Sequence, residues 1–196
     1  MDKIYRNESR RVFLFENLPA PLTAASSHLQ IFDNYIENTR LRIRSVRSPE
    51  TKKWTFILQQ LFPVDEDLSH WKIAEIYLND DEHQAFERFE GRKIKMNERI
   101  ISNEIRKNRY FYETGGRQIE LDIYLGDLRG LNMARVVCEN DDEITNFTLP
   151  HFAVLEVSNN PFFTGDSLVG KTLADVRQEL AKMQTNKEIS TTDADR

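Results

Sequence analysis

The chain has 196 residues, a formal net charge of −5, 39% hydrophobic residues and 30% charged residues, a composition typical of one globular domain. No stretch approaches about eighteen consecutive apolar residues, and Met1–Arg11 is too polar for a signal peptide, so neither a membrane span nor export is expected. The acidic net charge argues against DNA binding. The single cysteine, Cys138, predicts no internal disulfide, so we expect a cytoplasmic location.

Most of the chain is expected to form β-strands, because β-branched and aromatic residues gather in short runs bounded by turn residues. The predicted strands are Val12–Phe15, Leu29–Ile36, Arg40–Val46, Trp54–Leu61, Trp71–Leu78, Arg109–Glu113, Gln118–Leu125, Met133–Cys138 and Ala153–Val157. Gly115 and Gly116 separate two of these runs and predict a hairpin turn.

Two segments in the first half of the chain favour helices. Asn79, followed three residues later by Glu82, resembles a capping box, and Gly91 supplies a stop signal. We therefore predict a helix over Asp80–Glu90. A weaker helical signal lies at Thr23–His28.

The C-terminal region predicts one more helix. Apolar residues follow Thr172 at helical spacing, and the predicted helix closes on Met183. Residues 184–196 are polar and lack apolar periodicity, so they are expected to form a disordered tail. The sequence therefore predicts a single folded domain over residues 1–183.

Charged residues alternate with apolar ones along several predicted strands. Within Arg40–Arg44 the three arginines share one face of the strand, and Glu120 and Asp122 likewise share a face of theirs. This alternation has two interpretations. One is a sheet with a solvated face, and the other is a closed barrel with a polar interior and a covered apolar exterior. Alternation alone favours neither.

A series of short motifs follows the order found in one known family. In chain order they lie at Glu8–Leu14, Tyr35–Ile36 with Thr39–Arg44, Gln59 or Gln60, Ile76–Leu78, Lys107–Tyr110, Ile119–Asp122, Gly126–Leu131 and Glu156–Ser158. Together they span roughly Glu8 to Leu168, and their order carries the resemblance. The chain resembles the CYTH or triphosphate tunnel metalloenzyme family. The resemblance implies an α+β fold, mainly antiparallel β, in which a closed β-barrel has a few flanking helices.

The resemblance also implies a ligand and its site. In that family, basic residues in the tunnel bind the phosphate groups of a polyphosphate or nucleotide small molecule, and glutamates hold Mg²⁺ or Mn²⁺. The implied phosphate-binding residues are Arg40, Arg42, Arg44, Lys107 and Arg109. The implied metal ligands are Glu8 and Glu156. Glu139 shares strand parity with Arg135 and Val137, so we count it as a third candidate ligand that replaces missing carboxylates.

Several metal-binding positions depart from the family pattern. Arg10 stands where a second glutamate is expected, and Ala134–Val137 reads A-R-V-V in place of A-E-V-E. A glutamine also replaces a strand lysine at Gln59 or Gln60. Because arginines repel a cation, we expect Mg²⁺ or Mn²⁺ binding to be weak or absent. We also expect Arg10 and Arg135 to join the phosphate-binding residues.

Three functions follow, and the sequence leaves open whether the chain is an enzyme. The first is a hydrolase-like pseudoenzyme that binds a polyphosphate or nucleotide anion with weak or lost hydrolysis. The second is an active metal-dependent triphosphatase that uses the three glutamates. The third is a protein-interaction subunit whose lumen is closed by ion pairs. In that case Arg10 and Arg135 pair with acidic residues, drawn from Glu8, Glu156, Glu120 and Asp122.

Overall fold

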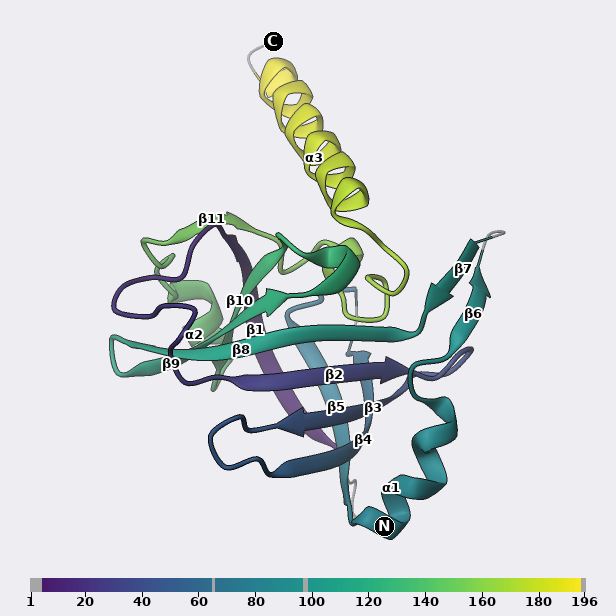
Figure 1. Cartoon of the computed structure of the whole chain (residues 1–196). Coiled ribbons are helices and arrows are strands. Elements are labelled where there is room, and N and C mark those ends of the chain that lie inside the picture. Colours follow the sequence, from purple (N-terminus) through teal and green to yellow (C-terminus); the bar gives the residue numbers. More distant parts are fainter. Residues whose placement is uncertain (1–4, 65, 97–98, 195–196) are drawn as a thin grey trace.

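The computed structural model describes residues 5–64, 66–96 and 99–194, and its central feature is a closed β-barrel (Figure 1). The barrel strands are β1 (Arg6–Phe15), β2 (Leu29–Tyr35), β3 (Leu41–Arg47), β4 (Trp54–Pro63), β5 (His70–Leu78), β8 (Glu104–Thr114), β9 (Arg117–Tyr124) and β10 (Asn132–Cys138). In this part of the chain, eight antiparallel strands follow one another in the order β10-β9-β8-β2-β3-β4-β5-β1. Pairing of β1 with β10 closes the ring. The expected fold class is therefore confirmed.

Strand β1 holds the barrel together because it pairs with three partners. Residues Arg6–Ser9 pair with β5, Ser9–Leu14 pair with β10, and Phe13–Phe15 pair with β11 (Ala153–Glu156). The register places Val12 opposite Arg135 and Arg10 opposite Val137. Alternate residues of β1 therefore face the lumen together with alternate residues of β10.

The outer face of β1, β8, β9 and β10 is apolar and covered. Its buried residues are Phe13, Phe15, Tyr110, Ile119, Leu121, Ala134, Val136 and Cys138. The segment around Leu18 and Leu22 and the segment around α2 (Asp141–Asn146) pack against this face, the latter through Phe147 and Phe152. Because these apolar side chains lie outside, the alternate side chains of the same strands point inward, and they include the charged residues Lys107, Arg109 and Asp122. The barrel interpretation of the alternating charges is therefore confirmed.

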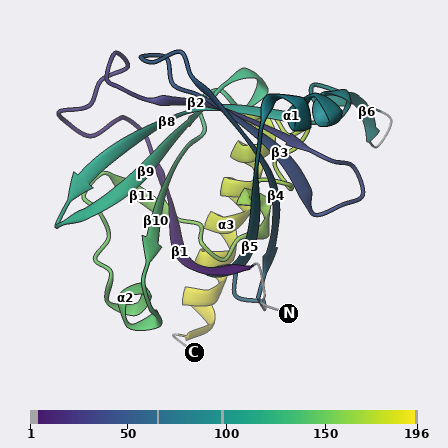
Figure 2. The ribbon, with the colours of Figure 1, turned by 90° about the horizontal axis from the view of Figure 1, so that it is seen from below.

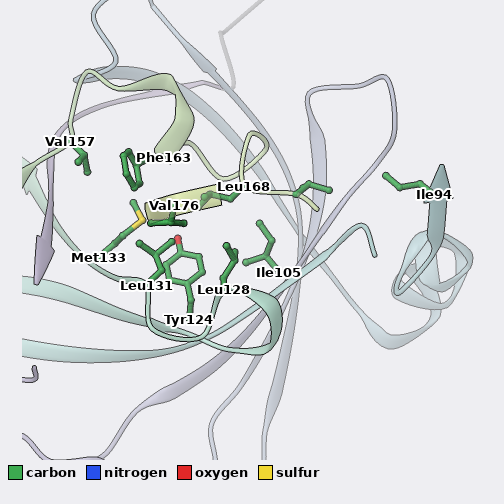
Figure 3. Close-up of a cluster of buried hydrophobic side chains, with 11 residues drawn as sticks. Ile94, Ile105, Tyr124, Leu128, Leu131, Met133, Val157, Phe163, Leu168 and Val176 are labelled. Atoms are coloured by element: carbon green, nitrogen blue, oxygen red, sulfur yellow. The ribbon is translucent and has the colours of Figure 1, made fainter. Parts of the chain in front are cut away.

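A second apolar cluster fills one end of the barrel (Figure 3). Phe163, Leu168 and Val176 meet Tyr124 and other strand residues there. These contacts attach the start of α3 (Leu173–Ala194) to the barrel. Seen from below, the strands form a ring and α3 lies behind it (Figure 2). The lumen is thus lined with apolar residues at the end next to α3.

The helix predicted at residues 80–90 begins where expected, but its α-helical part ends at Phe86. Helix α1 (Asp80–Phe86) begins with a capping box between Asn79 and Glu82, and a 3₁₀ turn, η1 (Glu87–Phe89), follows it. The helix predicted at Thr23–His28 is wrong, because this segment forms turns. There the backbone N–H of Thr23 donates to the Ser26 hydroxyl at 2.9 Å, a local side-chain bond that competes with a helix.

The C-terminal helix is longer than predicted. α3 continues to Ala194 instead of ending at Met183, so residues 184–194 are helical where a disordered tail was expected. This segment contains neither glycine nor proline, the two residues least compatible with a helix interior. The last two residues, 195–196, lie outside the described part. Among the described helices, none combines the length and the apolar character that crossing a membrane requires.

Five short elements were not predicted from sequence. These are the helix α2, the hairpin strands β6 (Lys93–Met96) and β7 (Arg99–Ser102) and the 3₁₀ turns η2 (Gly126–Leu128) and η3 (Pro161–Phe163). The η3 turn matters for the site, because it begins the segment that borders the lumen at the α3 end.

Candidate functional site

A cavity of ≈ 370 Å³ lies inside the barrel. Its basic lining residues are Arg10, Arg40, Arg42, Arg44, Lys107, Arg109 and Arg135. One wall is apolar and includes Leu61, Phe62 and Trp71, and the segment from Pro161 to Ser167 closes the end next to α3. The cavity therefore brings together every basic residue predicted to bind phosphate. A larger surface depression of ≈ 690 Å³ lies outside the barrel, and its only arginine among the described lining residues, Arg117, is paired with Glu143.

The arginines of β3 differ in their surroundings. Arg44 is buried and makes two hydrogen bonds to Asp33, from Nε at 2.6 Å and from Nη2 at 2.8 Å. Arg42 is also buried. Its Nε donates to Gln59 at 2.7 Å and its Nη1 donates to the Tyr35 hydroxyl at 3.1 Å. Arg40 is exposed and precedes β3. Two of the three predicted arginines therefore lie deep in the lumen, and the third lies at its mouth.

The basic residues of β8 are held by acids of β9. Arg109 makes two hydrogen bonds of 2.7 Å to Asp122, and its Nη1 lies 2.6 Å from Glu120. Lys107 Nζ lies 2.7 Å from Asp122 and 3.8 Å from Asp33. The antiparallel register sets these contacts by placing Arg109 directly opposite Asp122.

A third group links β1 and β10. Arg135 contacts Glu8 at 2.9 Å through Nη1, and its Nε donates to Glu120 at 2.7 Å. Arg10 reaches Glu8 only at 3.4 Å, and its guanidinium lies 4.0 Å from the centre of the Trp71 ring. The two arginines at former carboxylate positions are therefore inside the lumen, where the sequence placed them.

Burial and neighbouring charges shift the pKa values of these groups. Burial alone would raise the pKa of Glu8, but the positive charges of Arg135, Arg10 and Arg6 lower it to about 2. The same opposition lowers the pKa of Asp33 and Asp122, because Arg42 and Arg44 outweigh burial at Asp33, and Arg109 and Lys107 do so at Asp122. All three carboxylates are therefore ionised at neutral pH.

Burial lowers the pKa of two basic groups in the cavity, because it disfavours their charged form. Burial lowers the pKa of Lys107 to about 8, although Asp122 favours its charged form. Burial and the charge of Arg135 lower the pKa of Arg10 to about 9. Both groups carry their charge at neutral pH, but each is held there at an energetic cost.

We name ten buried or half-buried ionic side chains, which line the cavity or pair with its lining arginines, the lumen charge network. Its members are Glu8, Arg10, Asp33, Arg42, Arg44, Lys107, Arg109, Glu120, Asp122 and Arg135. Six are basic and four are acidic, so the network carries a net charge of two positive units. At the rim, Arg6 pairs with Glu75 at 3.3 Å, and these two charges cancel. The lumen therefore favours an anion.

The carboxylates do not fit a divalent cation. Each acid of the lumen charge network already lies within 3 Å of an arginine or lysine nitrogen. No group of three or more His, Cys, Asp or Glu side chains suited to a metal ion occurs among the described residues. Mg²⁺ and Mn²⁺ need carboxylate oxygens free of such partners.

The three predicted metal ligands are not brought together. Glu8 faces the lumen, but Glu156 lies on β11 and contacts Arg11 and the Ser158 hydroxyl, which donates to it at 2.6 Å. Glu139 is exposed beyond the end of β10, where its backbone N–H donates to Glu143 at 2.9 Å. Strand parity suggested that Glu139 faces the lumen, but β10 ends before it, so the alternation no longer applies.

Sequence reasoning missed Asp33, Tyr35 and Trp71 as site residues. Asp33 is 1% exposed and binds the predicted Arg44, although it lies in a strand that reads as apolar. The available signal was spacing: Ile31, Asp33 and Tyr35 are two residues apart along β2, so they share its lumen face. Trp71 begins a predicted strand, and its ring covers the guanidinium of Arg10.

Comparisons with known proteins agree with the fold. No protein-family model matches the chain, and no curated protein sequence matches it. Two crystal structures of NE1496 are similar. One, described as a hypothetical protein, has a TM-score of 0.53 at 17% identity over 84% of this chain and 99% of that chain. The other, described as the inorganic triphosphatase NE1496, has a TM-score of 0.53 at 18% identity over 84% and 95%. The chain thus has the closed antiparallel tunnel fold of NE1496, as the family resemblance implied.

Proposed function

We propose that the lumen binds the polyphosphate group of a small molecule, either inorganic polyphosphate or a nucleotide, and that hydrolysis is weak or lost. The observation that carries this proposal is the excess of basic over acidic side chains in the lumen charge network. The inorganic triphosphatase activity in the description of NE1496 supports a ligand of this class. The free, buried Cys138 is compatible with the reducing cytoplasm that we propose as its location.

Phosphate recognition follows from the chemistry of these side chains. Guanidinium groups present a planar fork of donors that matches two phosphate oxygens at once. Arg42 and Arg44 come from β3, Arg109 comes from β8, and all three line the same cavity, so they are suited to successive groups of a chain of phosphates. Because the cavity is partly closed off from water, each charge-assisted bond contributes about 1.5–3 kcal/mol.

Loss of hydrolysis follows from the carboxylates. A triphosphatase of this kind uses a divalent cation to orient water and to neutralise the charge that develops on the phosphates. Here Glu8 and Glu120 are bound by Arg135 instead, and Asp122 is bound by Arg109. This chain's own residues can hold and screen the anion, but Glu8, Glu120 and Asp122 are held by arginines and are not free to activate water.

The test is calorimetric titration with sodium tripolyphosphate, together with a phosphate-release assay. Wild-type protein is expected to bind the anion, with an affinity that falls as salt rises and that Arg42→Ala weakens. Phosphate release should stay at the level of buffer alone. Robust Mg²⁺-dependent release, abolished by Glu8→Gln, would show an active triphosphatase instead.

One observation favours a second candidate. Arg10 and Arg135 pair with Glu8, and Arg135 also pairs with Glu120, as a ligand-free interaction subunit requires. The cavity that remains and its net positive charge favour the anion-binding function over this one. If tripolyphosphate binds neither with Mg²⁺ nor without it, the interaction subunit is the better account.

A further inference from the structure

Arg10 is the least satisfied cation of the lumen charge network. Its Nε is one of two buried side-chain polar atoms that have no hydrogen-bond partner among the described residues. Its closest ionic contact, to Glu8, measures 3.4 Å, whereas Arg135 reaches the same oxygen at 2.9 Å. Native proteins rarely leave a buried donor unpaired, so this one calls for an explanation.

The position of Arg10 is nevertheless well defined. Its guanidinium lies 4.0 Å from the centre of the Trp71 ring, and its side chain is 14% exposed. Stacking on an indole covers one face of the guanidinium and leaves the donors at its edge able to bind an anion. Arg10 is thus held in place by an aromatic wall rather than by a full set of hydrogen bonds.

Two more arginines surround the same point. Arg135 shares the Glu8 oxygen with Arg10, and the positive charges of Arg135 and Arg42 both act on Arg10 and lower its pKa. The three come from β1, β3 and β10, and all line the cavity. Such mutual repulsion raises the free energy of the empty lumen, and an anion placed between the three would relieve it.

We propose that Arg10, Arg42 and Arg135 form an anion subsite against Trp71 that binds one phosphate group directly, without a bridging Mg²⁺ or Mn²⁺. This inference rests on the proposed function and adds the way in which the ligand is held. A phosphate group has several oxygens, so it can accept from three guanidiniums on different strands. The unpaired Nε of Arg10 gains a partner in the same step.

The experiment titrates sodium tripolyphosphate into wild-type protein and variants, in EDTA and in excess Mg²⁺. Arg10→Met keeps much of the packing on Trp71 but removes the charge, and Glu8 retains Arg6 at 2.8 Å and Arg135 at 2.9 Å. The matched control is Arg106→Gln, which removes an arginine charge whose side chain is 60% exposed and lies outside the cavity.

Wild-type affinity is expected to be nearly the same in the two buffers. Arg10→Met should weaken binding about 10- to 100-fold, or about 1.4–2.8 kcal/mol, in both buffers, while Arg106→Gln leaves it unchanged. Without ligand, the melting temperature of Arg10→Met should equal or exceed that of the wild type, because a repelled cation is gone. Arg10→Lys, which retains the charge on one nitrogen, should lose less affinity than Arg10→Met.

Three results would overturn the subsite, and a fourth would refute the proposed function on which it rests. If the wild type binds only with Mg²⁺, or if Arg10→Met binds as tightly as the wild type, the proposed function stands and the subsite fails. A marked fall in the melting temperature of Arg10→Met without ligand, with affinity retained, would show that Arg10 is structural. Absence of binding by the wild type in both buffers would refute the proposed function itself.

Discussion

Replacing Glu8 with glutamine should destabilise the protein yet strengthen anion binding. Glu8 is 4% exposed and contacts Arg6, Arg10 and Arg135. Its pKa falls from 4.5 to about 2 in the folded state. At 1.36 kcal/mol per pKa unit, this corresponds to about 3 kcal/mol of stability at neutral pH. For a chain of this size, a loss of that magnitude lowers the melting temperature by about 6–12 °C.

The anion affinity should move the other way. Without the carboxylate, Arg10 and Arg135 have fewer partners and the lumen charge network carries one more positive unit. A phosphate group beside them recovers part of the lost energy, and recovery of about 1.4 kcal/mol is a tenfold gain in affinity. We therefore expect Glu8→Gln to bind tripolyphosphate about tenfold more tightly in EDTA, and to show a larger ligand-induced rise in melting temperature.

The control is Glu104→Gln, which removes a carboxylate that pairs with the exposed Arg106. Its affinity should match that of the wild type. If Glu8→Gln binds tripolyphosphate more weakly than the wild type, and only when Mg²⁺ is present, then Glu8 acts as a metal ligand. The reasoning from ion pairs would then be wrong, and the active triphosphatase would gain support.

Two further predictions concern Lys107 and Gly165. The pKa of Lys107 falls from 10.5 to about 8 on folding, so between these values the unfolded state binds more protons and the contribution of Lys107 to stability rises with pH. In the folded protein Lys107 loses its positive charge around its pKa of about 8. The ratio of wild-type to Lys107→Met affinity for tripolyphosphate should therefore decrease between pH 7 and pH 9, and a constant ratio would contradict this. Gly165→Ala should lower the melting temperature, because a methyl group there overlaps the Tyr35 hydroxyl, and overpacking costs about 1–3 kcal/mol. An unchanged melting curve would show that the segment shifts freely.

The sequence predicted the barrel and its basic wall for a physical reason. Alternation of period two fixes which side chains share a face, and the order of motifs decided that the charged face points inward. Arg10, Arg42 and Arg135 were therefore placed correctly. What sequence reasoning does not provide is the pairing between strands, which depends on register. The contacts of Asp33 with Arg44 and of Glu8 with Arg135 follow from the pairing of β2 with β3 and of β1 with β10.

Strand ends were the other source of error. Glu139 has the parity of a lumen residue, but β10 ends at Cys138 and the chain turns toward α2. Glu156 lies on a strand that pairs with β1 outside the closed ring, so its carboxylate meets Arg11. The polar stretch after Met183 is helical although it lacks apolar periodicity, because it contains neither glycine nor proline and its residues tolerate a helix.

The triple pairing of β1 has a consequence for how the protein folds. The pairing of β1 with β10 joins residues more than a hundred positions apart in the chain, and contacts between such distant residues form slowly. Until β10 is present, the other barrel strands form an open sheet, with β9 and β1 at its unpaired edges and with unmatched charges on its inner face. Unpaired edges recruit other chains. Deletion of residues 5–15 should therefore cause aggregation of the protein rather than merely weaken its ligand binding.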